Sequence, residues 1–204
     1  MPRDKTASHV KIIEAAKAEF LKFGFTDASM RRIAAGAGIT APALYKHFPS
    51  KEDMFASLVD PAIDGYMALY RELEVEYDEE LKTADKDNLW ASQNGTIRGM
   101  AYVYDHFDEF KLVICKSRGT KYEEFTHMVA DWEEKVTGRY MKNLSKTGIK
   151  VNKINKKEFH LLVTANIEAL FQPVIHDFTR KEAMHYAETL EKFYMPAWKV
   201  LFGI

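Results

Sequence analysis

Several features that define common protein classes are scarce in this chain of 204 residues. Its single cysteine, Cys115, excludes a disulfide within the chain and favours a reducing compartment such as the cytosol. Only ten glycines and six prolines are present, and no long stretch alternates between apolar and polar residues. These absences argue against a disulfide-stabilised extracellular fold and against a β-rich fold. They favour an all-α protein.

Long apolar segments are lacking too. The most apolar stretch, residues 161–175, is interrupted by Asn166, Glu168, Gln172 and Pro173, so it cannot span a membrane. The first residues show no charged-then-apolar signal pattern. We therefore expect a cytoplasmic protein without a membrane partner.

Sequence motifs of enzymes and metal sites are also missing. The seven histidines form no HExxH arrangement, and the chain contains no GxSxG, P-loop or GxGxxG sequence. Three apolar residues precede Cys115, which predicts a buried thiol and not a nucleophile. The sequence thus predicts no catalytic residue, no metal and no cofactor.

The net charge of −1 conceals an uneven distribution of charge. Residues 1–55 hold nine Lys and Arg against six Asp and Glu, so this part carries +3 and the remainder −4. The sharpest acidic run, at residues 72–80, lies in the second part, and we interpret it as a solvated helix face. The front of the chain is the part suited to a polyanionic partner.

Residues 26–55 carry the most informative pattern. Ser29 is expected to cap a short helix over about residues 30–37, with Gly38 in the turn that follows. Thr40 is expected to cap a second short helix, whose first turn tolerates Pro42. A short helix with small side chains at its beginning, flanked by hydroxyl and cationic groups, fits a DNA major groove.

The predicted DNA contacts surround these two helices. Leu44 and Phe48 are expected to face the core, which leaves Tyr45 and Lys46 exposed. Lys51 follows the helix cap Ser50, where a cation opposes the helix dipole, and a phosphate over that helix end would explain it. His47 is also compatible with capping its own helix. The complete set of predicted contacts is Thr26, Ser29, Met30, Arg31, Thr40, Ala41, Pro42, Ala43, Tyr45, Lys46, His47 and Lys51.

Residues 10–55 resemble the DNA-binding domain of the tetracycline-repressor (TetR/AcrR) family. The run LYKHFPSKEDMF is the most characteristic part of this resemblance, which also rests on Ile13, Ala16, Phe20, Gly24, Phe25, Ile33, Ala34, Ala37 and Gly38. The resemblance implies an N-terminal three-helix, helix-turn-helix domain continuous with a larger helical domain for ligand binding and dimerisation. It further implies a homodimeric repressor in the bacterial cytosol, associated with the nucleoid, that a small molecule releases from a palindromic operator.

The second part of the chain is expected to be entirely helical. We expect the domain boundary after residue 55, with one helix running from the first domain into the second. Helical patterns cover roughly residues 55–82, 88–106, 107–115, 121–146, 156–178 and 180–202.

Aromatic and polar side chains of the second part suggest an apolar or aromatic effector, although aromatic residues at helical spacing are equally typical of a core. The predicted effector-binding residues are Tyr102, Tyr104, Phe107, Cys115, Tyr122, Phe125, Trp132, Asn166, Glu168, Phe171 and Gln172. Glu168, Gln172 and His176 form one stripe, which would face solvent, a dimer partner or a cavity.

The last two helices are apolar on more than one side, so they need covering by a second copy. The predicted dimerisation residues are Leu162, Ile167, Leu170, Val174, Leu190, Phe193, Tyr194 and Trp198. A DNA-binding regulator without a small-molecule effector, or an activator, remains the alternative function.

Overall fold

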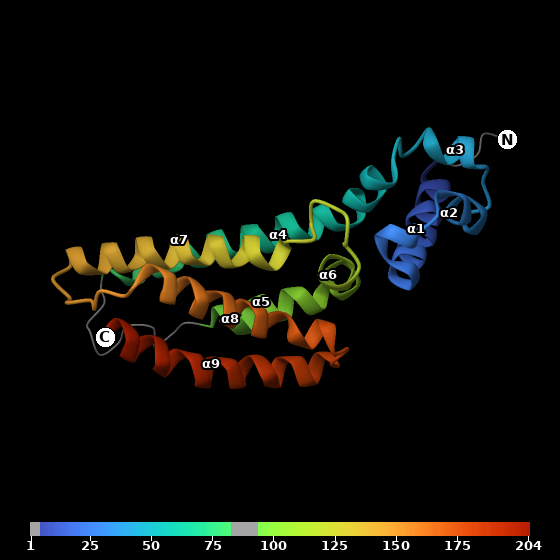
Figure 1. The fold of residues 1–204 in the computed structure, drawn as a ribbon. Coiled ribbons are helices and arrows are strands. Elements are labelled where there is room, and N and C mark those ends of the chain that lie inside the picture. The colour runs from blue at the N-terminus through green and yellow to red at the C-terminus, as the bar shows by residue number, and fades with distance from the viewer. Residues whose placement is uncertain (1–4, 83–93) are drawn as a thin grey trace. The chain divides into compact units, whose positions relative to one another are not determined.

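The structure, a computed structural model, describes residues 5–82 and 94–204, except for the side chains of residues 5–7. Every regular element in these ranges is an α-helix (Figure 1). The helices are α1 (Lys5–Asp27), α2 (Met30–Gly36), α3 (Ala41–Tyr45), α4 (Lys51–Glu80), α5 (Gly95–Asp105), α6 (Phe107–Cys115), α7 (Phe125–Lys146), α8 (Lys156–Ile175) and α9 (Arg180–Phe202). The predicted all-α fold is confirmed. The predicted break at 83–87 and helix start at 88 lie outside the described residues.

The chain divides into two compact units. The first comprises residues 1–65 and 106–124, and the second comprises residues 66–105 and 125–204. The first unit therefore extends beyond the boundary expected after residue 55. The difference arises because Leu58, Val59 and Ala62 of α4 are buried, and because α6 packs against α1. None of the helices in the described ranges is long and apolar enough to cross a membrane.

Three buried phenylalanines form the centre of the first unit. The ring of Phe55 lies 5.2 Å from Phe20 and 5.5 Å from Phe25, edge-on in both cases. Tyr122 packs against Phe55 and donates its hydroxyl hydrogen to the Asp60 carboxylate. The backbone N–H of Phe25 donates to the carbonyl of Lys116 at 2.8 Å. Residues 106–124 are thus a structural part of the first unit.

The predicted ends of the short N-terminal helices agree with the structure. Gly24 has a φ of 73°, a left-handed conformation that interrupts α1. The side chain of Ser29 caps α2, and that of Thr40 caps α3. Ser50 accepts a hydrogen bond from the backbone N–H of Asp53 at 2.9 Å, as predicted for the start of α4.

The second unit is a bundle in which α7, α8 and α9 run alongside one another (Figure 1). The side chain of Asn155 caps α8, while Thr179 and Glu182 form a reciprocal capping box at the start of α9. Met100 of α5 packs with Leu170 of α8 and with Ala183 and Ala187 of α9. These contacts place α5 against the C-terminal pair of helices.

Candidate nucleic-acid interface and ligand cavity

Helices α2 and α3 form a compact helix-turn-helix in the first unit. Gly38 occupies the turn with a φ of 69°, and the N–H of Ile39 donates to the carbonyl of Ala34 at 2.9 Å. Ile33 and Leu44 are buried, so each of the two helices is fixed by one apolar face. The buried faces determine which side chains of α3 reach the solvent.

The exposed surface of α3 consists mainly of residues predicted to contact DNA. Tyr45 is 49% exposed, while Leu44 and Phe48 are buried, as their spacing predicted. Thr40, Pro42, Lys46 and His47 are exposed, and Ala41 and Ala43 are half-buried. Neither Lys46 nor Arg31 forms an ion pair with any residue in the described ranges. Their positive charges are therefore available to a polyanion.

Lys51 has a structural role that the sequence analysis did not predict. Its ammonium group donates to the carbonyls of Thr26 at 3.0 Å and Ala28 at 3.2 Å, and lies 4.6 Å from the centre of the Phe25 ring. A phosphate is therefore not needed to explain a cation at this position. The amino group reaches carbonyls that follow the interruption of α1, so a cation is favourable there without DNA.

Lys51→Met is expected to lower the free energy of unfolding of the protein by about 2 kcal/mol, because charge-assisted hydrogen bonds contribute roughly 1.5–3 kcal/mol. Methionine keeps most of the apolar stem and removes the donors. Urea unfolding monitored by circular dichroism measures the change. Lys142→Met, at an exposed site on α7, is the control and should shift stability by less than about 0.5 kcal/mol. Equal stability of the two variants would contradict the role of Lys51.

Other predicted contacts near α2 have internal partners. Met30 is buried, so its side chain supports α2 and offers DNA no surface. Thr26 donates its hydroxyl hydrogen to the carbonyl of Arg118 at 3.1 Å. Arg32 forms an ion pair with Glu19, whose carboxylate also accepts from the backbone N–H of Ser29. The Arg32 hydrogen bond, together with the Ser29 N–H, lowers the pKa of Glu19 against the opposing effect of burial.

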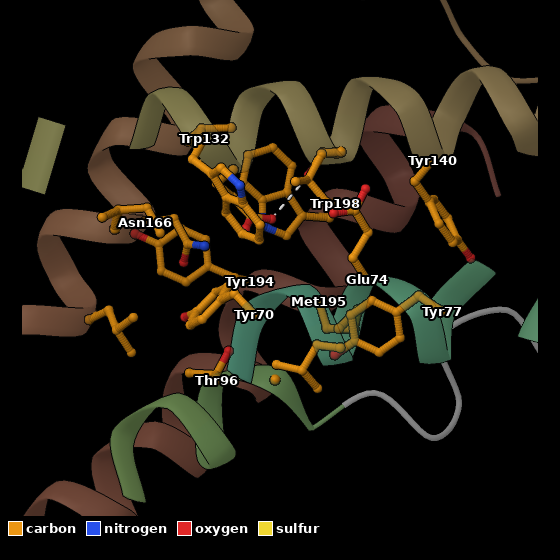
Figure 2. Close-up of a pocket in the computed structure, with 18 of the residues that line it drawn as sticks. Tyr70, Glu74, Tyr77, Thr96, Trp132, Tyr140, Asn166, Tyr194, Met195 and Trp198 are labelled. Atoms are coloured by element: carbon orange, nitrogen blue, oxygen red, sulfur yellow. Dashed lines mark hydrogen bonds between the residues drawn. The ribbon is translucent and has the colours of Figure 1, made fainter. Parts of the chain in front are cut away.

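A cavity of about 180 Å³ lies within the second unit. Figure 2 shows side chains from α4, α7, α8 and α9 around it, among them Tyr70, Trp132, Asn166, Tyr194 and Trp198. The Tyr70 and Trp132 rings meet edge-on, with centroids 5.4 Å apart. Phe159, Tyr77 and Tyr140 complete a largely aromatic wall. Such a lining suits a ligand with an apolar body.

Acidic groups interrupt this apolar wall. Glu133 accepts a hydrogen bond from the Thr137 hydroxyl at 3.0 Å, and burial raises the pKa of its carboxyl. Glu191 accepts from the backbone N–H groups of Ile97 and Thr96, which lower its pKa, although burial raises it more. Glu74 is paired with Arg139 at 2.5 Å. The cavity therefore combines aromatic rings with carboxylates.

Only two of the predicted effector-binding residues, Trp132 and Asn166, line this cavity. Phe107, Cys115 and Tyr122 belong to the first unit, and Cys115 is exposed, so the prediction of a buried thiol is wrong. Phe125 and Phe171 are buried in the core. The ring of Tyr102 packs against that of Tyr66, with centroids 6.0 Å apart. Tyr104 donates to the carbonyl of Phe178. Glu168 and Gln172 do not line the cavity.

The cavity residues of α4 were not predicted from the sequence. Tyr70, Glu74 and Tyr77 recur at spacings of four and three, so they share one helix face. The interpretation of residues 72–80 as a solvated face hid this pattern, because Glu74 and Asp78 line the cavity while Glu72, Glu76 and Glu79 are exposed. The helical spacing of Tyr70 and Tyr77 is the feature of the sequence that could have predicted a cavity-lining face on α4.

The residues predicted to mediate dimerisation separate into three groups. Ile167, Leu170, Val174 and Leu190 are buried within one chain, which corrects their assignment to a dimer interface because no surface remains for a second copy. Tyr194 and Trp198 are half-buried and line the cavity. Leu162 and Phe193 are exposed, at 43% and 70%.

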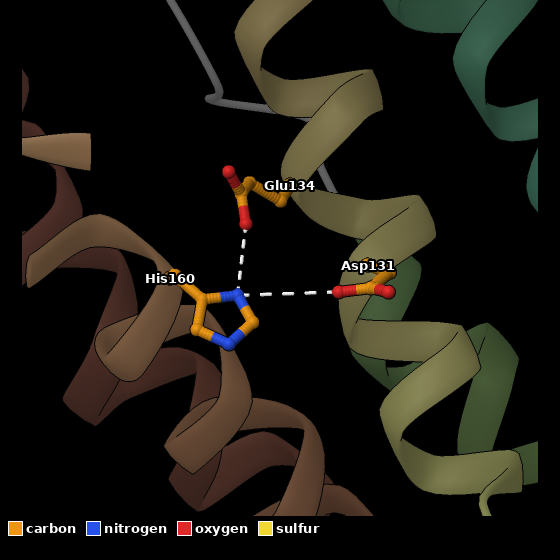
Figure 3. A group of neighbouring side chains, drawn as sticks. All are labelled: Asp131, Glu134 and His160. Atoms are coloured by element: carbon orange, nitrogen blue, oxygen red, sulfur yellow. Dashed lines mark hydrogen bonds and ion pairs between the residues drawn. The ribbon is translucent and has the colours of Figure 1, made fainter. Parts of the chain in front are cut away.

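Asp131, Glu134 and His160 form a polar cluster between α7 and α8 (Figure 3). The Nδ1 atom of His160 lies 2.9 Å from a Glu134 carboxylate oxygen and 4.0 Å from one of Asp131. His160 is 39% exposed and Asp131 59%, so the cluster is accessible to water. A hydrogen bond that ties α8 to α7 accounts for the arrangement.

Comparisons with known proteins agree with this geometry. Residues 12–58 match the family described as bacterial regulatory proteins, tetR family. The HTH-type transcriptional repressor KstR2 of Mycobacterium tuberculosis is 40% identical over 63 residues, which make up 31% of this chain and 32% of that protein. The match thus spans about a third of the length of this relative.

Solved structures resemble the chain over nearly its whole length. A TetR-like transcriptional regulator from Rhodococcus sp. RHA1 has a TM-score of 0.60 at 19% identity and covers 98% of both chains. NalD, the secondary repressor of the MexAB-OprM multidrug efflux pump in Pseudomonas aeruginosa, has a TM-score of 0.57 at 17% identity and covers 92% of this chain and 97% of its own. The first unit contains a helix-turn-helix DNA-binding domain. Residues 12–58 are thus similar to the DNA-binding domain of the TetR family, and the solved structures show that the whole chain shares the fold of such regulators.

Proposed function

We propose that this protein is a homodimeric transcriptional repressor of the bacterial cytosol that binds a palindromic DNA operator and is released by a small ligand. The observation that carries the DNA-binding proposal is the surface of α3, where Thr40, Tyr45 and Lys46 are exposed around a small-residue helix start. A major groove is wide enough to admit an α-helix of this kind. Arg31, exposed at the start of α2, adds a second phosphate contact.

Dimerisation through α8 and α9 is supported by the exposed apolar residues on these helices. Phe193, Pro196, Ala197 and Val200 are exposed at helical spacing on α9, and Val200 is 78% exposed. On α8, Leu161 and Leu162 are exposed as well. Such contiguous apolar stripes on neighbouring helices are typical of an interface. Two copies related by twofold symmetry would present two recognition helices to a palindrome.

The cavity of the second unit supports release by a ligand and favours it over the alternative of a regulator without an effector. Tyr70, Glu74 and Tyr77 of α4 line the cavity, and the same helix begins at Lys51 in the first unit. We propose that a ligand stabilises a conformation of α4 in which the two copies of α3 no longer match the operator. A hundredfold loss of DNA affinity requires about 2.7 kcal/mol of coupling.

Selection of binding sites from a random DNA duplex library tests the repressor proposal. We expect a palindrome with half-sites roughly one helical turn apart, about 34–36 Å. A gel shift with the recovered site then measures affinity, and retention of the site by the dimeric protein supports the proposal. Selection of no specific site, or of a single asymmetric half-site, would contradict it.

Lys46→Ala is expected to weaken DNA binding across sequences and to reduce the slope of log K against log salt by about 0.9, the change for one lost phosphate contact. Gel shifts at several salt concentrations measure both quantities. Lys142→Ala on α7 removes the same charge away from α3 and should leave the slope unchanged.

Tyr45→Ala should weaken DNA binding with little change in the salt slope, because the tyrosine hydroxyl is neutral. Wild-type behaviour of both α3 variants would refute the proposed docking.

A further inference from the structure

The charges around the cavity indicate which ligands it can accept. Among the residues that the structure describes, four carboxylates line it, from Glu74, Asp78, Glu133 and Glu191, and one guanidinium, that of Arg139. Arg139 is already paired with Glu74. An anionic ligand would therefore meet uncompensated negative charge in a partly dehydrated site, where repulsion is strongest.

Glu133 is a cavity carboxylate whose charge no cation in the described part of the chain balances. The Glu191 carboxylate is held by the N–H groups of Ile97 and Thr96 at the start of α5, where the helix dipole also favours a negative charge. Within the described ranges, the one side-chain donor to Glu133 is the neutral hydroxyl of Thr137, and no cation there forms an ion pair with it. The neighbouring charge of Glu74 adds to its desolvation, and both effects raise the pKa of Glu133.

The aromatic rings provide a second means of binding a positively charged ligand. Trp132 directly precedes Glu133 in α7, and its ring meets that of Tyr70 edge-on. Tyr194 and Trp198 line the cavity from α9, stacked with centroids 6.5 Å apart (Figure 2). The faces of such rings attract cations as well as apolar groups. A neutral apolar ligand would satisfy the rings and leave Glu133 without a counter-ion.

We propose that this cavity selects ligands that combine an aromatic body with a permanent or protonated positive charge, with Glu133 as the counter-ion and the surrounding rings as the cation-binding wall. The inference rests on the proposed function, because it names the class of ligand that acts at the same site. The expected ligand is an aromatic amine or a quaternary ammonium compound with an aromatic group.

A matched pair of probes tests this inference on the full-length protein. Biphenyl-4-yl-trimethylammonium and 4-tert-butylbiphenyl have nearly the same shape and differ in one positive charge. Quenching of tryptophan fluorescence, to which Trp132 and Trp198 in the cavity contribute, measures their binding. We expect the wild-type protein to bind the cation at least about tenfold more tightly than the neutral probe. Equal affinities, or binding of neither probe, would overturn the inference.

Glu133→Gln locates the preference at one side chain. This variant keeps the shape and hydrogen-bonding capacity of the residue and removes its charge. It should lose at least about tenfold in affinity for the cation while binding the neutral probe within about twofold of wild type, which also shows that the cavity is intact. Glu158→Gln, at an exposed site on α8, removes the same charge outside the cavity and should change neither affinity. A preference for the cation that survives in Glu133→Gln would overturn the assignment.

A gel shift with the selected operator separates the failure of this inference from the failure of the proposed function. If the cation binds with the expected preference but leaves the protein on DNA, the ligand class is supported and release by a ligand is refuted. If the neutral probe releases DNA as effectively as the cation, release is supported and the role of Glu133 is refuted. Release by the cation alone supports both.

Discussion

Ala43→Asp is expected to abolish specific DNA binding while leaving the protein as stable as wild type or slightly more stable. Ala43 lies in the first turn of α3 and is half-buried, and its backbone N–H donates to the Thr40 side chain. A carboxylate in a first helical turn interacts favourably with the helix dipole, by roughly 0.3–1 kcal/mol. The same carboxylate would face base edges and phosphates in the groove. Folding and binding are therefore expected to change in opposite directions.

The expected loss of affinity is more than about a hundredfold, because like charges brought together in an interface cost several kcal/mol and each 1.4 kcal/mol corresponds to a factor of ten. Fluorescence anisotropy with the selected operator measures the affinity, and thermal unfolding measures the stability. Ala43→Asn has nearly the same shape without the charge and should retain much of the binding. Unchanged affinity of the aspartate variant would remove α3 from the DNA interface.

Replacing both Phe193 and Val200 with glutamate is expected to convert the proposed dimer into folded monomers. The two side chains are 70% and 78% exposed in the single chain, so the substitutions leave its core intact. In a twofold dimer each substitution acts twice. Loss of four apolar contacts at about 1.5 kcal/mol each removes about 6 kcal/mol, which corresponds to a roughly ten-thousandfold weaker dimer.

Sedimentation velocity measures the change in mass, and a gel shift on the palindrome should show a parallel loss of DNA binding. Val75→Glu introduces a charge at another exposed apolar residue, on α4, and should leave the dimer intact. A dimer that persists in the double variant would place the interface elsewhere. Monomers that bind the palindrome with wild-type affinity would contradict the proposal that two DNA-binding domains are needed.

The sequence predicted the helices of the first unit well because local signals determine them. Ser29, Thr40 and Ser50 begin helices through side-chain oxygens that bond to nearby backbone N–H groups, and Gly24 and Gly38 adopt left-handed conformations. Such interactions span only a few residues, so a pattern in the sequence reveals them. The amphipathic spacing of Leu44 and Phe48 likewise predicted which side of α3 is exposed.

The cavity and the role of Lys51 depend on contacts between distant parts of the chain, which no local pattern encodes. Lys51 reaches carbonyls 25 and 23 residues earlier in the sequence. The cavity brings together side chains of five helices, from Tyr70 to Phe202. Aromatic residues at helical spacing gave the right kind of lining but not the right residues, because core and cavity positions have the same periodicity. Trp132 lines the cavity, whereas Phe125, on the same helix, is buried in the core.

The discontinuity of the first unit limits how natural or designed recombination could exchange its parts. Residues 106–124 supply Leu112 and Val113 as buried side chains, the Lys116 carbonyl that accepts from Phe25, and the Tyr122 hydroxyl bonded to Asp60. A chimera joined after residue 65 would keep the DNA-reading helices but lose these partners. Transplanting the DNA specificity of this regulator onto another regulator would therefore require two grafts, made together, from separate places in the gene.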